Sequence, residues 1–359
     1  MGKALLAAGV TVVLTIGVPV AGATTCVVGG TNGVGGGPSQ AELHGYVAQG
    51  FVPADPNTFG IDYPAQLWPV SGTVTLDDSV HQGVETLDGK VHSTDGPITL
   101  VGTSQGAVVL NYEKLRLMAE DNPPPDVTFI TVADPTNSDG GVLAKFAPLH
   151  IPILEFTFTP APVATPYDTI EYVREYDGVA DFPDHPLNLL ADLNALAGGI
   201  SLHPNYGGLD PKADDVVVTH STNALGGETT HYLFPTKNLP LTQALRDLGV
   251  DPNLVDAIDK PLRTIIDAGY DGPRPGRPVQ PATTPPSGLD EARTVSATTT
   301  PSAPDRARTV SATTQRTASH QPPKSLSKGP IRAAIKARAE RRDAVKARAV
   351  ERRAAADSE

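Results

Sequence analysis

The segment Ile98-Thr-Leu-Val-Gly102-Thr103-Ser104-Gln105-Gly106-Ala107-Val-Val-Leu110 decides the fold of this chain. Its first part is a short β-branched run typical of a buried strand, and its last part begins a helix. Between them stands Gly-x-Ser-x-Gly, the pentapeptide of a nucleophile elbow. In such a turn the serine backbone is strained, and side chains at Gly102 and Gly106 would clash with the neighbouring strand and helix. The segment predicts that Ser104 presents its hydroxyl at the start of a helix, whose amides can stabilise negative charge.

Strand-like and helical runs alternate on either side of this segment. Most of the strand-like runs are apolar without a polar alternation, which suits a parallel sheet covered on both faces. We therefore predict an α/β-hydrolase fold, a doubly wound and mostly parallel sheet with helices on both faces. The strand-like runs are 24–31, 98–103, 127–134, 169–176 and 216–219, and the helical runs are 79–92, 105–120, 186–197 and 253–268.

Composition and charge exclude several classes of protein. The 359 residues carry a formal net charge of −12, but 31 acidic and 11 basic residues lie in 1–270, against 9 and 17 in 271–359. Residues 1–270 thus carry a net charge of −20 and residues 271–359 a net charge of +8. This charge distribution excludes a uniformly basic nucleic-acid binder. The single cysteine, Cys26, excludes a disulfide framework and a cysteine-rich zinc module.

The N-terminus is typical of an export signal. Lys3 is the only charge before the uncharged apolar stretch 4–23, and Ala21-Gly22-Ala23 is a small-x-small cleavage site. We predict a signal peptide over 1–23 and a secreted or cell-envelope protein. The alternative is a retained N-terminal anchor, because about 20 apolar residues can span a bilayer.

The C-terminal quarter differs in composition from the rest of the chain. Eleven prolines lie between 271 and 359, and the sequence Ala-Arg-Thr-Val-Ser-Ala-Thr-Thr occurs at 292–299 and again at 307–314. Such a segment cannot bury enough apolar area to offset the entropy of ordering it. We predict one globular domain over 24–270, a disordered Pro/Thr/Ser-rich linker over 271–329, and a basic Ala/Arg-rich tail over 330–359. That tail favours helix, and it is either solvated or in contact with the envelope or an anionic membrane surface.

Acyl transfer needs hydrogen-bond donors at the developing oxyanion. One is expected to be the backbone N–H of Gln105, the residue after the nucleophile. The apolar pair Val27-Val28 leads into Gly29-Gly30-Thr31-Asn32-Gly33, and we expect the second donor there, at Thr31 or else Asn32. Two other interpretations are a plain glycine-rich turn and a phosphate-binding loop, but the phosphate-binding glycine order is lacking. We expect no cofactor.

A nucleophilic serine needs a histidine base and a carboxylate that orients it, and in this fold class the order is Ser, acid, His. Asp177 follows a late strand directly, and Asp181 follows one turn later, so Asp177 is favoured and Asp181 is the alternate. His203 lies in a loop, whereas His231 lies in the run 229–235, which we interpret as an edge strand. We therefore favour His203 as the base, with His231 as the alternate.

No metal site is expected, because His203 and His220 have no His, Cys or Asp partners at recognisable ligand spacing.

Several apolar residues between 156 and 190 either line a lipid pocket or belong to the core, and we favour the core. These residues are Phe156, Phe158, Pro160, Pro162, Leu187, Leu189 and Leu190.

Six segments in order resemble one family. They are Val28-Gly-Gly-Thr31, Asp62-Tyr-Pro64, Gly102-Thr-Ser-Gln-Gly106, Tyr176-Asp-Gly-Val-Ala-Asp-Phe-Pro183, His203-Pro-Asn-Tyr206 and Phe234-Pro-Thr-Lys-Asn-Leu-Pro-Leu241. Over about 24–250 the chain resembles the PE-PPE domain, the cutinase-like serine α/β-hydrolase domain of mycobacterial exported and cell-envelope proteins. It is similar to the stand-alone branch without a PE or PPE helical module, in which acyl transfer onto envelope glycolipids is known. The resemblance implies Ser104 as nucleophile, His203 as base and an acid in the Tyr-Asp-Gly segment.

These observations predict an exported serine esterase, similar to lipases, that cleaves acyl esters through an acyl-enzyme on Ser104, with Asp177 and His203 completing the triad. The alternative is an acyltransferase that moves acyl chains onto a trehalose-type or other envelope glycolipid. A third and weaker hypothesis is an inactive envelope-binding module. The expected partners are an acyl-ester or lipid substrate and, for the transferase, a sugar acceptor; no nucleic acid is expected.

Overall fold

The computed structural model describes residues 24–52, 57–124 and 126–276. The predicted signal peptide, the predicted tail and the predicted linker from residue 277 onward lie outside the described residues. Among the helices that are described, none is long and apolar enough to cross a membrane.

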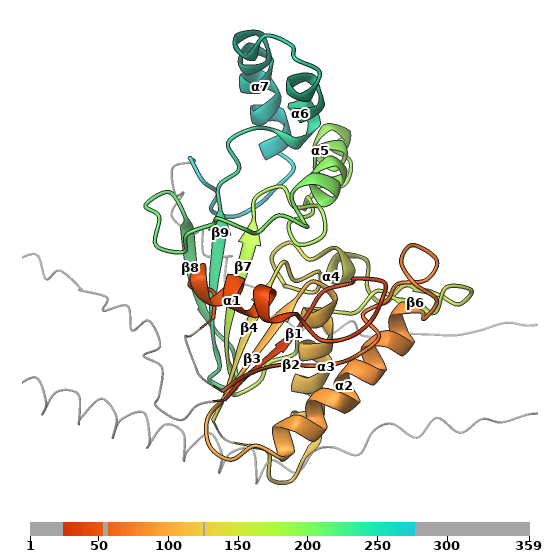
Figure 1. The fold of residues 1–359 in the computed structure, drawn as a ribbon. Coiled ribbons are helices and arrows are strands. Elements are labelled where there is room, and N and C mark those ends of the chain that lie inside the picture. The colour runs from red at the N-terminus through yellow and green to blue at the C-terminus, as the bar shows by residue number, and fades with distance from the viewer. Residues whose placement is uncertain (1–23, 53–56, 125, 277–359) are drawn as a thin grey trace, which may run out of the picture.

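A seven-stranded sheet forms the centre of the domain (Figure 1). Six neighbouring strands run parallel to one another, and the seventh, at one edge of the sheet, pairs antiparallel to its neighbour. The chain passes from β1 to β2 at one edge and then crosses to β3 on the other side of β1, so the direction of the strand order reverses between β1 and β3. In open α/β sheets, ligands bind at the carboxyl ends of the strands at such a point. The order is β2 (Thr58–Gly60), β1 (Thr24–Val28), β3 (Ile98–Thr103), β4 (Val127–Val132), β7 (Asp168–Arg174), β9 (Glu228–Phe234) and β8 (Val217–Thr222).

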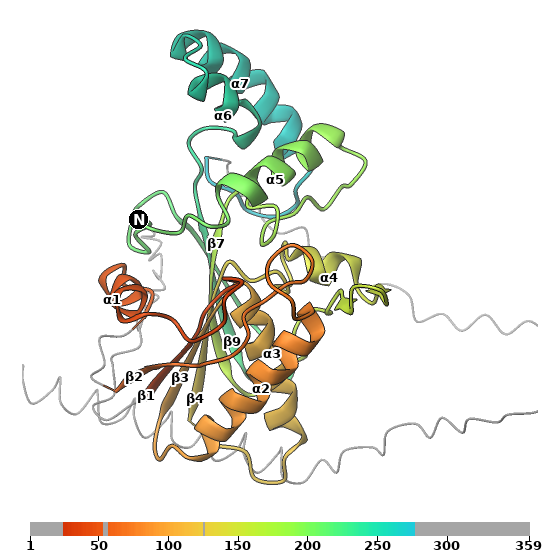
Figure 2. The same cartoon turned by 45° about the vertical axis from the view of Figure 1, so that its right-hand side comes forward.

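Helices cover both faces of the sheet (Figures 1 and 2). On one face, α2 (Leu76–His92) and α3 (Gln105–Ala119) pack over a core that includes Leu100 and Phe129. On the other face, α1 (Gln40–Ala48) packs over Val27 and Tyr172. This arrangement confirms the predicted doubly wound α/β fold.

Three helices stand beyond the carboxyl edge of the sheet and form what we call the helical cap (Figure 1). They are α5 (Leu189–Ser201), α6 (Pro240–Asp247) and α7 (Pro252–Asp267), and they share a small core with Tyr176. The short helix α4 (Val142–Phe146) and a separate hairpin of β5 (His150–Ile151) and β6 (Phe156–Thr157) complete the described part.

One strand differs from its predicted position. The run 229–235 was expected at an edge, but β9 lies between β7 and β8 and pairs with both, so that prediction is wrong. The edge is β8, whose second half is polar and exposed. The helix α1, the short strand β2 and the helix α6 were not predicted, because none of these segments shows a long periodic pattern.

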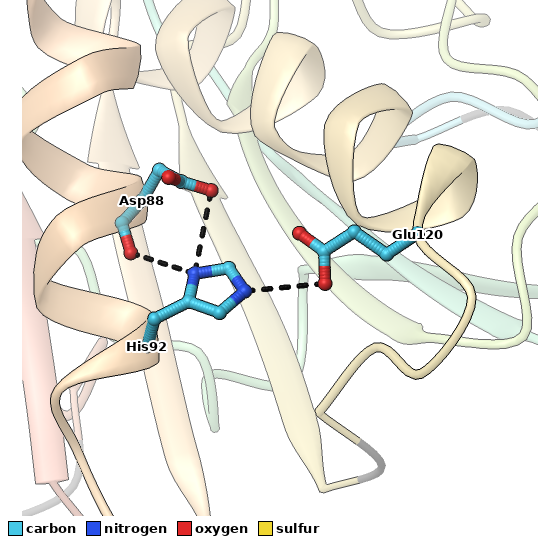
Figure 3. Close-up of side chains that lie close together, drawn as sticks. All are labelled: Asp88, His92 and Glu120. Atoms are coloured by element: carbon cyan, nitrogen blue, oxygen red, sulfur yellow. Dashed lines mark hydrogen bonds and ion pairs between the residues drawn. The ribbon is translucent and has the colours of Figure 1, made fainter.

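Charged side chains join the C-terminal halves of α2 and α3 (Figure 3). Nδ1 of His92 lies 2.9 Å from the carbonyl oxygen of Asp88, and Nε2 lies 3.1 Å from Oε2 of Glu120. Arg116 Nε lies 2.9 Å from Oδ1 of Asp88. The hydrogen bonds to Asp88 and Glu120 raise the pKa of His92 above its usual value.

Glu113 on α3 is fully buried close to these charges, and neither of its carboxyl oxygens has a hydrogen-bond partner among the described residues. Burial, and next the negative charge of Asp88, raise the pKa of Glu113 from 4.5 to about 8. Between these two values the folded chain holds a proton that the unfolded chain has lost. The stability of the fold therefore decreases as pH rises through this window.

We expect Glu113→Gln to remove this pH dependence. The neutral amide has nearly the same shape, so the variant should be more stable than the wild type at pH 8–9, by about 1–3 kcal/mol, and similar to it near pH 5. Thermal unfolding followed by circular dichroism from pH 5 to 9 measures this. Glu85→Gln, at a side chain that is 60% exposed on α2, is the control. Parallel curves for Glu113→Gln and wild type would contradict the prediction.

Candidate active site

Ser104 stands in the tight turn between β3 and α3, with φ 51° and ψ −113°. A positive φ at a residue with a side chain is a strained conformation that the surrounding structure has to hold. A Cβ at Gly102 would overlap the Leu110 side chain, and one at Gly106 would overlap the carbonyl oxygen of Val28. The predicted close approach at both glycines is therefore confirmed, and it leaves Ser104 projecting from the carboxyl end of β3.

A continuous hydrogen-bonded chain links Ser104, His203 and Asp177. Oγ of Ser104 lies 2.8 Å from Nε2 of His203. Nδ1 of the same ring lies 2.9 Å from Oδ2 and 3.1 Å from Oδ1 of Asp177. Since a carboxylate can only accept, Nδ1–H donates to Asp177, and Nε2 is left to accept the serine proton. The His203 side chain is 17% exposed, so a substrate can reach it, whereas Asp177 is fully buried.

Tyr206 holds the Asp177 carboxylate from a second side. Its hydroxyl donates to Oδ2 of Asp177 at 2.8 Å and accepts from the backbone N–H of Arg174 at 3.0 Å. The backbone N–H of Val179 donates to Oδ1 at 3.0 Å. Burial and the charge of Asp177 raise the pKa of Tyr206 well above its usual value, so its hydroxyl remains a donor. Sequence reasoning did not assign this role to Tyr206, although the residue stands in the quoted segment His203-Pro-Asn-Tyr206.

The glycine turn after β1 lies against Ser104. A Cβ on Gly30 would be 3.3 Å from Cβ of Ser104, which places the adjacent Thr31 beside the turn. Among the described residues, neither the Gln105 N–H nor the Thr31 N–H has a hydrogen-bond partner. The Asn32 N–H instead donates to the carbonyl oxygen of Ala65 at 2.9 Å. Of the two candidates on this loop, Thr31 therefore has the free donor.

The alternate acid, Asp181, has a different set of partners. Its carboxylate accepts two hydrogen bonds from the Arg274 guanidinium, at 3.0 and 2.6 Å, and one from the backbone N–H of Tyr176 at 2.7 Å. Asp181 and Arg274 are both buried. The packed structure thus continues past residue 270, and Asp181 anchors that final segment rather than facing His203.

The alternate base, His231, is buried in the sheet. Its Nδ1 lies 3.0 Å from Oε2 of Glu171 on the neighbouring strand. Burial alone would lower the pKa of His231, but the hydrogen bond and charge of Glu171 raise it above its usual value. The described structure therefore does not bring His231 to Ser104.

One group among the described residues has the side chains that a metal ion would need, namely Asp88, His92 and Glu120 between α2 and α3 (Figure 3). The two carboxylates contact opposite edges of the imidazole ring, Asp88 at Nδ1 and Glu120 at Nε2. Asp88 is also paired with Arg116. These contacts form an ion-pair network between two helices, and we assign it no catalytic role.

A cavity of about 320 Å³ lies between α2, α3 and β6. Its lining is mostly apolar, with Leu76, Val80, Val84 and Val108, and its polar groups include Asp77 and Tyr112.

Phe156 and Phe158 pack against the adjacent core, as expected for core residues. Leu187 and Leu189, in contrast, are 94% and 70% exposed, so the prediction that they belong to the core is wrong.

Replacing the two aspartates separates their roles. We expect Asp177→Asn to lower kcat by about 10⁴-fold, because the amide cannot hold the imidazole in the required tautomer and charge state. Asp181→Asn should leave kcat close to wild type and lower the free energy of unfolding by about 3 kcal/mol, because the buried Arg274 loses its hydrogen-bonded carboxylate and keeps only the longer contact with Glu175, at 3.7 Å. Ester turnover and chemical denaturation of both variants measure this. A larger loss of kcat in Asp181→Asn would assign the acid to that residue instead.

Removing the Tyr206 hydroxyl should weaken catalysis without changing binding. Tyr206→Phe takes away one hydrogen bond to the buried carboxylate, and we expect kcat to fall about tenfold with KM unchanged. Tyr112→Phe is a matched control, because it removes the same hydroxyl from a tyrosine that contacts Thr159, at 3.4 Å, and not Asp177. Equal kcat values for the two variants would rule out a positioning role for Tyr206.

The chain is similar to several proteins of Mycobacterium tuberculosis (strain ATCC 25618 / H37Rv). SL1278 acyltransferase Chp1 is 42% identical over 224 residues, which are 60% of this chain and 54% of Chp1. Esterase PE16 is 38% identical over 221 residues, 59% of this chain and 42% of PE16. Diacyltrehalose acyltransferase Chp2 is 36% identical over 267 residues, 65% of this chain and 74% of Chp2. The chain thus spans about half the length of Chp1 and less than half of PE16.

The structure superposes on a solved acetylxylan esterase over 50% of this chain and 98% of the esterase chain, with 16% sequence identity and a TM-score of 0.31. Because that superposition is poor, we assign the fold from the strand order and the turn at Ser104. The PE-PPE domain model matches residues 54–271, which is more than half of the sequence. The chain therefore belongs to the PE-PPE domain family.

Proposed function

We propose that this chain is a serine enzyme that acts on acyl esters and passes through an acyl-enzyme on Ser104. The observation that carries the proposal is the continuous hydrogen-bonded chain from Ser104 Oγ through His203 to the buried Asp177. A nucleophile, a base in contact with it and a carboxylate that orients the base are what nucleophilic acyl transfer requires.

In the first half-reaction, Ser104 Oγ attacks the ester carbonyl carbon while its proton moves to Nε2 of His203. The negative charge on the carbonyl oxygen is stabilised by the N–H groups of Gln105 and Thr31. Asp177 stabilises the imidazolium that forms. When the tetrahedral intermediate collapses, the C–O bond to the alcohol breaks, and Nε2 returns the proton to the leaving oxygen.

In the second half-reaction, a hydroxyl compound attacks the acyl carbon of the ester on Ser104. Its proton moves to Nε2 of His203, and the same N–H groups hold the oxyanion. The bond to Ser104 Oγ then breaks, and Nε2 returns the proton to the serine. Water as the acceptor releases a free acid, whereas a sugar hydroxyl yields a new ester.

Hydrolysis is the simplest outcome, since water needs no acceptor site, and esterase PE16 is among the relatives. Acyl transfer is the second candidate, and a specific observation favours it. Chp1 is named an SL1278 acyltransferase, and Chp2, of which the match covers 74%, is named a diacyltrehalose acyltransferase. These names support an acyl lipid as the donor and a trehalose-type sugar as an acceptor for this chain. Export by the N-terminal segment would bring the enzyme to such lipids.

The first experiment compares wild type with Ser104→Ala on p-nitrophenyl esters of increasing chain length, with and without trehalose. We expect Ser104→Ala to lose about 10⁴-fold or more in kcat and all labelling by a fluorophosphonate. Ser93→Ala, at an exposed serine after α2, should keep both. Acyl-trehalose formed at the expense of free acid would identify the transferase.

Two outcomes would oppose the proposal. Turnover that survives in Ser104→Ala would place the nucleophile elsewhere. Folded wild-type protein that neither turns over esters nor reacts with the fluorophosphonate would leave an inactive binding module.

A further inference from the structure

The helix α5 presents large apolar side chains to solvent. Leu189, Leu193, Leu196 and Ile200 are 70%, 52%, 63% and 76% exposed. Their spacing of four, three and four residues puts them on one face of the helix, and we call this face the α5 stripe. A helix at the surface of a water-soluble domain normally has polar residues there. Such a continuous exposed apolar face marks an interaction surface.

The inner face of α5 is already occupied, so the stripe cannot turn inward. The buried positions are the small residues Ala191, Asn194, Ala195 and Gly198. A side chain at Gly198 would overlap the carbonyl oxygen of Tyr176, and one at Gly178 would overlap that of Ala195. The helix is thus fitted closely to the loop that carries Asp177. The large apolar residues are held outward by this fit.

One end of the α5 stripe lies close to the candidate active site. The helix ends at Ser201, and His203, two residues later, contacts Ser104. Leu187, 94% exposed, precedes the other end of the helix. Figures 1 and 2 show α5 beyond the carboxyl edge of the sheet, the edge that carries Ser104 and Asp177. A partner bound on the stripe would therefore lie on the same side of the domain as Ser104 and His203.

The charges near the stripe disfavour an anionic partner. Asp192 is the only ionisable residue of α5, and the helix has no basic residue. Residues 1–270 carry 31 acidic and 11 basic residues, so the field of the domain repels anionic surfaces. A neutral lipid layer fits both the apolar face and the charge.

We propose that the α5 stripe docks the enzyme on an uncharged acyl-lipid surface, from which the ester substrate reaches Ser104. This inference deepens the proposed function, because it assigns the substrate to a lipid phase rather than to solution. The apolar side chains enter the acyl region of the layer, and the entrance of the site then faces the layer.

A fluorescent label placed on the stripe tests the docking directly. Cys26 is fully buried, and burial raises the pKa of its thiol to about 11, so it does not compete for a thiol-reactive dye. Leu196→Cys in the full chain, carrying Ser104→Ala, is labelled with an environment-sensitive dye and mixed with phosphatidylcholine vesicles. Leu115→Cys on α3, at a leucine that is 43% exposed, is the control. Neutral vesicles are the probe because the basic tail has no electrostatic attraction to them.

We expect a blue shift and at least about a twofold rise in emission for the label at 196 and no change at 115. A label at 196 that does not respond to vesicles would overturn the proposal. A shift that depends on protein concentration without vesicles would overturn it in favour of a second copy of the chain as the partner.

Kinetics test the consequence for catalysis. In Leu193→Ser/Leu196→Ser, turnover of an ester embedded in neutral vesicles should fall about tenfold, while turnover of a soluble short-chain ester stays unchanged. Equal loss on both substrates would mean damage to the site and would contradict a docking role. The two proposals also fail separately. A vesicle response at 196 in a chain without esterase activity would reject only the proposed function, and an active enzyme without the response would reject only the docking surface.

Discussion

The arrangement of the site depends on the hydrogen bonds that the buried carboxylate of Asp177 accepts. A charge that is removed from water is costly unless donors surround it. Here His203, Tyr206 and the Val179 N–H supply them. Because His203 and Tyr206 come from the loop after α5, the carboxylate fixes the end of that helix against β7. The imidazole is thereby held with its other nitrogen at Ser104.

The sheet brings these parts together from distant positions in the chain. Ser104 follows β3 and Asp177 follows β7, while the glycine turn beside Ser104 follows β1. Parallel strands end at the same edge, so three segments that are far apart in sequence meet there. The glycines at 102 and 106 are required by this convergence, since backbone and side chains of neighbouring elements occupy the space of their missing Cβ atoms. The backbone geometry of Ser104 is thus a consequence of how closely β1, β3 and α3 pack.

The strand–turn–helix at 98–110 could be predicted because its signals are local: a β-branched run, two glycines around a serine and a helical continuation. The choice of Asp177 over Asp181 depended on which carboxylate directly follows the strand, and both lie near the same edge. What the sequence could not reveal was the partner of the second carboxylate. Arg274 is 93 positions from Asp181 and beyond the predicted end of the domain, so no local pattern connects them. The edge strand was misplaced for a similar reason, because strand order is a non-local property.

The exposure of α5 was also unpredictable, for a physical reason that bears on function. A run with leucines at 187, 189, 190, 193 and 196 looks like a core helix, and in most domains such a helix would turn these residues inward. Here the close backbone contacts at Gly178 and Gly198 require small residues on the inner face. Leu190 still packs against the core of the helical cap, but Leu189, Leu193 and Leu196 are left outside. The same contacts position the loop of Asp177. One packing solution therefore positions Asp177 and exposes an apolar face on the same helix. A substitution that let α5 rotate to bury the leucines would displace Asp177 and His203 together, so the exposed face and the hydrogen-bonded chain from Ser104 to Asp177 are two consequences of one constraint.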